Sequence, residues 1–197
     1  MRWAIETTSG PAVEPMTTAE AKTHLQENLA TWDAYIDTLI LTARILIEEE
    51  LGRSLITQTK VMYLDSFPIA QTIMLPQSPA QSVTSVSYVD TDGASQIWAS
   101  SKYALDAKSR PARLYLAYNE SYPTTRTIEN AVTITYVAGY GTASTDIPAP
   151  IIHAMKLMIT DWYDNREASC GNQQYELPMG AKRLLSPYKM YYRGPIV

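Results

Sequence analysis

Hydrophobic residues recur at helical spacing soon after the chain begins. Residues 1–16 contain two prolines and no hydrophobic period, so we expect an extended N-terminal arm. Residues 17–20, Thr-Thr-Ala-Glu, form a capping box that predicts a first helix through about Glu27. A second helix is predicted over residues 32–51, with Gly52 as its left-handed C-cap. Its apolar stripe consists of Ile36, Ile40, Ala43, Ile47 and Leu51, widened by Leu39 and Leu46.

After Gly52 the hydrophobic period changes from that of a helix to that of a strand. Residues 56–64 are dominated by β-branched and aromatic side chains, which predicts a strand. Further strand-length runs lie at 72–75, 83–89, 96–98, 103–106, 113–117 and 131–137. The runs 83–89 and 96–98 flank a turn with Asp92-Gly93 and predict a β-hairpin. Because no helix-length segment separates consecutive strands, we expect a mainly antiparallel sheet.

Helical periodicity returns after residue 145. Asp146 is the predicted N-cap, Pro148 falls in the first turn, and the helix is expected to end near Ala168. Its apolar face consists of Ile151, Ile152, Met155, Met158, Ile159 and Trp162. A short helix over 178–185 follows, and Pro187 prevents its continuation.

This order of elements predicts an α+β fold. The N- and C-terminal helices, over 17–52 and 147–186, are expected to form a helical bundle, with the β region of about 54–138 inserted between them. A chain of 197 residues suits one such domain, which we predict over 17–187. Residues 188–197 are then a C-terminal tail.

Composition excludes several functional classes. Hydrophobic residues make up 46% of the chain and charged residues 18%, which is enough apolar material for a core. The net charge of -4 disfavours a sequence-reading DNA-binding protein, and the single cysteine, Cys170, excludes an internal disulfide framework. The N terminus has no signal-peptide pattern and no stretch is long enough to span a membrane, so we expect synthesis in a cytoplasm and no membrane partner.

Few residues offer catalytic chemistry. Asp161, Asp164 and Glu167 follow one another at three-residue spacing on the late helix, and His153 precedes them. Such carboxylates either hold a cation for a small metal-dependent hydrolase or form a solvated helix face. The other histidine, His24, has no metal-binding neighbour at helical spacing, and no phosphate-binding motif occurs. We therefore predict no catalytic residue, no metal site and no cofactor.

Charge and tyrosine are unevenly distributed along the chain. Residues 1–50 contain nine acidic and three basic residues, whereas residues 177–197 contain four basic residues and no acidic one. Of the 14 tyrosines, which stand against one phenylalanine, several lie in this basic tail. Exposed aromatic and basic side chains together are typical of a segment that binds a partner. The predicted partner-binding residues are Lys182, Arg183, Tyr188, Lys189, Tyr191, Tyr192 and Arg193.

Five segments of the chain resemble segments that occur in the same order in the head-tail connector proteins of tailed bacteriophages, which are also called adaptor or head-completion proteins. Together they extend over most of residues 14–188. They are Glu14–Leu25, Glu50–Thr59, Leu75–Pro79 with Val83–Val86, Val132–Gly141 and Trp162–Glu167.

The resemblance implies a structural protein of the virion neck, at the head–tail interface, and not an enzyme. Such proteins assemble beneath the portal protein, usually as a twelve-fold ring, extend the DNA channel, and dock the next neck, stopper or tail-completion protein. By the same likeness, Leu185–Val197 would bind the portal. DNA contact in the channel would be non-specific and salt-dependent.

A ring requires each subunit to offer two different, complementary faces. The acid-rich N-terminal part and the basic tail are candidates for them. One further alternative stays open, a β-rich module that binds a host surface or glycan through its Tyr and Trp side chains.

Overall fold

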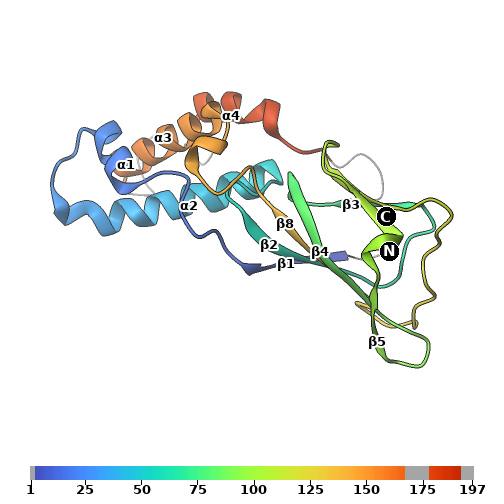
Figure 1. The fold of residues 1–197 in the computed structure, drawn as a ribbon. Coiled ribbons are helices and arrows are strands. Elements are labelled where there is room, and N and C mark those ends of the chain that lie inside the picture. The colour runs from blue at the N-terminus through green and yellow to red at the C-terminus, as the bar shows by residue number, and fades with distance from the viewer. Residues whose placement is uncertain (1–2, 167–177, 192–197) are drawn as a thin grey trace. The chain divides into compact units, whose positions relative to one another are not determined.

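The computed structural model describes residues 3–166 and 178–191 (Figure 1). Its contacts divide the chain into two compact units. The β unit takes its described residues from Met1–Pro11, Thr57–Gly139 and Met190–Val197, and the helical unit takes its own from Ala12–Ile56 and Tyr140–Lys189. The single domain over 17–187 stays a prediction. No helix within the described ranges is both long and apolar enough to cross a membrane.

The first two helices of the helical unit follow the predicted pattern. Helix α1 (Thr18–Leu25) begins with the capping box, in which Thr17 and Glu20 satisfy each other's backbone N–H groups. Hydrogen bonds from the backbone and the side chain of Thr17 lower the pKa of Glu20. Helix α2 (Asp33–Leu51) ends at Gly52, which is left-handed with φ 62°. A 3-10 turn (Ala30–Trp32) connects the two helices.

The last two helices differ from the prediction mainly at the start and end of the longer one. Helix α3 (Ala149–Asp164) is capped by Pro148, not by the predicted Asp146. Asp146 ends a 3-10 turn, where its carboxylate accepts a hydrogen bond from the Ala143 amide. The helix stops at Asp164, before the expected end at Ala168. Helix α4 (Met179–Leu185) follows as predicted, and a 3-10 turn (Ser186–Tyr188) that was not predicted comes after it.

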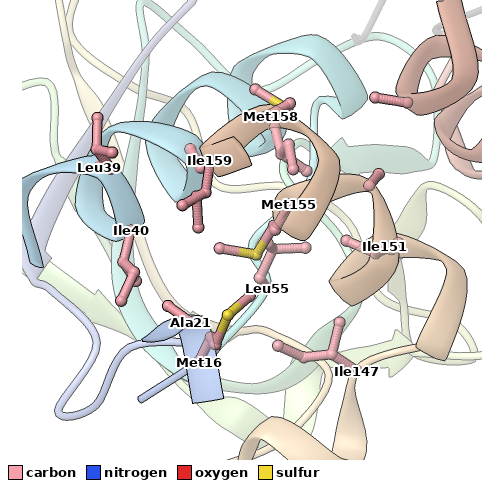
Figure 2. Packing of buried hydrophobic residues seen from close by; sticks show 14 of the residues in the cluster. Met16, Ala21, Leu39, Ile40, Leu55, Ile147, Ile151, Met155, Met158 and Ile159 are labelled. Carbon is pink, nitrogen blue, oxygen red and sulfur yellow. The ribbon is translucent and has the colours of Figure 1, made fainter. Parts of the chain in front are cut away.

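Side chains from all four helices bury into one hydrophobic core. Figure 2 shows Ala21 of α1, Ile40 of α2 and Met155 of α3 gathered around Leu55. Ala181 and Leu185 bring α4 to the same cluster. Burying such side chains is worth about 1.5–3 kcal/mol each, so this core fixes the positions of the helices relative to one another.

The larger sheet of the β unit has five antiparallel strands in the order β1-β2-β8-β4-β5. They are β1 (Trp3–Ser9), β2 (Gln58–Leu64), β8 (Val132–Ala138), β4 (Ala80–Val89) and β5 (Ser95–Trp98). The predicted hairpin is the pair β4–β5. The predicted N-terminal arm is extended, but its residues 3–9 pair with β2 as an edge strand that the hydrophobic pattern did not reveal.

A smaller antiparallel sheet has the order β3-β7-β6. Its strands are β3 (Thr72–Leu75), β7 (Ala112–Leu116) and β6 (Tyr103–Asp106). Both sheets contribute to a second core, in which Phe67 stacks on Tyr122 with ring centroids 4.8 Å apart. Burial raises the pKa of Tyr122 to about 12. The predicted α+β class with antiparallel pairing of the strands is confirmed.

Candidate partner-binding surfaces

The predicted partner-binding residues lie along α4 and the segment after it. Lys182 and Arg183 are exposed on α4, and Tyr188 and Lys189 are half-buried. Tyr191 is 67% exposed, whereas Met190 beside it is only 8% exposed. Tyr192 and Arg193 lie outside the described residues, so the structure describes five of the seven predicted residues.

The beginning of this stretch is held by the helical unit. Lys189 Nζ lies 2.6 Å from Glu50 Oε1, and Arg53 Nε donates a hydrogen bond to the Tyr188 carbonyl. Leu185 is 2% exposed and belongs to the helical core. The segment that the resemblance assigned to portal binding therefore includes the buried residues Leu185 and Met190 as well as the exposed Tyr191.

The three glutamates that end α2 have three different surroundings. Glu48 is buried. Its Oε2 atom lies 3.0 Å from Arg44 Nη1, and its Oε1 atom accepts a hydrogen bond from the Leu55 amide. Glu50 pairs with Lys189. Glu49 is exposed and forms no ion pair with any described residue. The glutamate run is thus partly structural, and only Glu49 is left to face a partner.

Arg44, which interrupts the apolar stretch of α2, is a buried structural residue. It is 8% exposed, and its Nε lies 2.7 Å from Glu14 Oε2. Burial alone would lower the pKa of Arg44, but the hydrogen bonds and charges of Glu14 and Glu48 outweigh it and raise that pKa. The arginine ties the segment before α1 to α2.

An apolar groove lies between α3 and α4. Its apolar lining consists of Leu157, Leu184 and Pro187, and the exposed side chains of His153 and Arg183 lie at it as well. The volume of the groove is about 580 Å³. Arg183 forms no ion pair with a residue that the structure describes. The groove was not predicted, because it combines residues that are some 30 positions apart and depends on how α4 packs on α3.

A second unpredicted surface is the outward side of α2. Leu41, Ile45 and Leu46 are between 40% and 42% exposed there. The prediction that Leu46 widens the buried stripe is wrong, whereas Leu39 does belong to it at 7% exposure. Helical spacing carries the signal for this surface, since Leu41 and Ile45 are one turn apart and lie away from the buried stripe.

Two of the three candidate catalytic carboxylates, Asp161 and Asp164, lie within the described residues. Asp161 accepts a hydrogen bond from the Asn165 side chain, and Asp164 is exposed at the end of α3. Glu167 lies outside the described residues. Throughout 3–166 and 178–191, no group of three potential metal ligands occurs.

The other histidine of the sequence, His24, has a lowered pKa. Burial is the largest cause, and the charges of Lys156 and His153 add to it.

An aromatic cluster holds the end of α3 against the start of α2. The Arg166 guanidinium carbon lies 4.1 Å from the Trp32 ring centroid and 4.8 Å from that of Tyr163. Tyr163 donates a hydrogen bond of 2.8 Å to Glu27. The backbone hydrogen bond from Leu29 and the side-chain hydrogen bond from Tyr163 lower the pKa of Glu27. These contacts stabilise the helical unit.

Comparison with known proteins covers nearly the whole chain. A family model described as head completion protein matches residues 14–190. No curated protein matches the chain.

Solved structures share the fold over their full length. A chain in the neck of an empty GTA particle, computed with C6 symmetry, has a TM-score of 0.79 at 19% identity, covering 96% of this chain and 97% of that chain. A chain in the virion of a native gene transfer agent (GTA) particle has a TM-score of 0.79 at 20% identity, covering 98% and 99%. A chain in the neck of a native GTA particle, computed with C12 symmetry, has a TM-score of 0.73 at 21% identity, covering 98% and 97%.

Proposed function

The chain belongs to the head completion protein family, and from this premise we propose that it is a structural connector in the neck of a tailed phage or phage-like particle. The observation that carries the proposal is the family match over residues 14–190. The fold likeness to neck chains of GTA particles supports the same location. The role is assembly rather than catalysis.

In this role the chain forms a ring of twelve copies beneath the portal protein and extends the DNA channel. The symmetric necks in which the similar chains occur support a ring. The predicted helical bundle would be the body of each subunit. The net charge of -4 favours passage of DNA over tight binding, so contact with DNA is limited to phosphates and weakens with salt.

The two ends of the ring bind different proteins. Tyr191, Tyr192 and Arg193 contact the portal, and Lys182 of α4 is a further predicted partner-binding residue. Aromatic and basic anchors of this kind dominate the energetics of many interfaces. Tyr188 and Lys189 hold the start of this segment to the helical unit. The opposite end docks the next neck, stopper or tail-completion protein.

Reconstitution of particles tests the proposal. DNA-filled heads assembled without this chain should lack tails, and purified chain added to them should restore tail attachment. The variant Lys108→Gln, changed at an exposed residue of the β unit, is the matched control and should restore attachment equally. Heads that acquire tails without the chain would contradict the proposal.

A further inference from the structure

The outward surface of α2 is suited to burial against another apolar surface. Leu41 and Ile45 lie on it one turn apart, and Thr38 and Thr42 lie beside them. The hydroxyl of Thr38 donates to the Ala34 carbonyl and that of Thr42 to the Thr38 carbonyl. Because both hydroxyls are satisfied within the helix, this α2 face can lose water without leaving those groups unpaired.

The α3–α4 groove offers a surface of matching character on the same unit. Leu157 and Leu184 in it are half-buried, and Gly180 keeps the groove open, since it has no side chain. A Cβ added at Gly180 would meet only Leu157 Cδ1, at an ordinary contact distance of 3.5 Å. A single methyl group therefore fits at residue 180, whereas a much larger side chain there would extend into the groove.

The α2 face and the groove point in opposite directions. Ile40 of α2 and Met155 of α3 both belong to the hydrophobic core of the helical unit (Figure 2). At about 100° per residue, Ile45 is about 140° around α2 from Ile40, and Leu157 about 160° around α3 from Met155. Each surface thus faces away from the shared core, which is the arrangement that a head-to-tail contact between identical subunits requires.

Free charges of opposite sign accompany the two surfaces. Glu49, one turn after Ile45, is exposed, and Arg183 is exposed at the groove. Neither forms an ion pair with another described residue. A contact between copies brings these charges together and sets the register, because opposite charges steer and orient association more than they add affinity.

We propose that the α2 face of one copy docks into the α3–α4 groove of the next copy, and that repetition of this contact closes the ring. Ile45 is the apolar anchor and Glu49 pairs with Arg183 of the neighbouring copy. The inference rests on the proposed ring and adds which two surfaces form its subunit contact.

Thiol cross-linking tests which surfaces meet. Cys170→Ser removes the only cysteine, and Ile45→Cys and Leu184→Cys then add one thiol on each surface. Rings bound to portal-bearing heads are treated with a short bifunctional thiol reagent. The double variant should give a ladder of covalent oligomers, whereas each single variant should stay monomeric on a denaturing gel.

Two outcomes would overturn the inferred subunit contact without contradicting the proposed ring. Dimers formed by Ile45→Cys without its partner would show a two-fold contact, and an assembled ring without a ladder would show that other surfaces meet. If the cysteine-free chain forms no ring on portal-bearing heads, the proposed ring fails and the inference with it.

Charge reversal and groove filling provide a second readout. Glu49→Arg and Arg183→Glu should each lower occupancy on portal-bearing heads about tenfold, equivalent to about 1.4 kcal/mol, and the double variant should restore it.

Gly180→Phe should block assembly, while Gly180→Ala, whose added methyl group makes only an ordinary contact, should not. Unchanged occupancy for Gly180→Phe, or no rescue by the double reversal, would overturn the proposal. Thermal unfolding of each variant confirms that it is folded.

Discussion

Lys189 Nζ lies 2.6 Å from Glu50 Oε1, although 139 positions separate the two residues. Both side chains are 38% exposed, so the pair contributes at most about 1 kcal/mol to stability. Its consequence is positional. Together with the hydrogen bond from Arg53 to the Tyr188 carbonyl, it holds the chain to the end of α2 until Lys189. Tyr188 and Lys189, both predicted to bind a partner, are thereby attached to the helical unit.

Deletion of residues 191–197 should leave a folded protein that no longer attaches to portal-bearing heads. The deleted range begins at the exposed Tyr191 and spares the buried Met190. Co-sedimentation with heads measures attachment, and circular dichroism measures folding.

A deletion of residues 185–197 serves as the contrasting variant. It removes Leu185, whose burial in the helical core resembles sites where truncation to alanine costs about 2–5 kcal/mol. We expect this longer deletion to be destabilised as well as unattached. Full attachment by the shorter deletion would show that the portal contact lies elsewhere.

Arg166→Gln should lower stability by about 0.5–1 kcal/mol, because it removes the cation stacked over Trp32 at 4.1 Å. For a chain of this size, thermal unfolding should then shift downward by about 1–4 °C. Arg183→Gln, which changes an exposed arginine without an ion pair to a described residue, should leave the midpoint unchanged. Equal midpoints for Arg166→Gln and wild type would show that the aromatic cluster does not need its cation.

Tyr136→Phe should cost about 1–2 kcal/mol. The Tyr136 hydroxyl is buried and donates a hydrogen bond of 2.6 Å to the Pro76 carbonyl, which the variant leaves without this donor. Urea unfolding measures the loss. Tyr115→Phe, at a tyrosine that is 43% exposed, is the matched control and should unfold like wild type. A larger loss for Tyr115→Phe than for Tyr136→Phe would contradict the assigned burial.

Asp106→Asn should reduce stability at neutral pH and matter less in acid. Hydrogen bonds from the side chains of Ser109, the largest cause, and Arg113 hold the pKa of Asp106 well below its ordinary value of 3.8. A lowered folded pKa means that the ionised carboxylate stabilises the fold above the unfolded-state value, and that this stabilisation is lost as the pH falls through the folded pKa.

The urea midpoints of wild type and Asp106→Asn should therefore differ at neutral pH and converge below about pH 3.8. Asp164→Asn, which changes an exposed carboxylate at the end of α3, is the control for loss of a surface charge and should not lower the urea midpoint at neutral pH. A constant difference between wild type and Asp106→Asn down to about pH 2 would be inconsistent with the lowered pKa.

Periodicity and capping signals were sufficient to predict most elements. Thr17, Glu20 and Gly52 mark helix ends through local backbone hydrogen bonding, which sequence shows directly. The N-terminal strand was missed because an edge strand that is exposed at nearly every position has no apolar face to produce a signal. It joins the sheet through backbone pairing with β2.

The binding surfaces were harder to predict than the elements. The basic, tyrosine-rich composition predicts that the C-terminal stretch binds a partner, and this stays a prediction. The Lys189–Glu50 pair, by contrast, depends on the fold and has no local sequence pattern. The α3–α4 groove likewise requires α4 to be placed on α3. Asp146 was wrongly predicted as a helix cap because a 3-10 turn and Pro148 intervene before α3.

Electron cryomicroscopy of necks on portal-bearing heads tests the central claim most directly. Heads assembled with this chain should show a closed ring of it beneath the portal, with each copy contacting its neighbours through two different surfaces. The same heads assembled without the chain provide the reference map. A portal that carries no density for the chain, or density for it only elsewhere in the particle, would contradict the connector role.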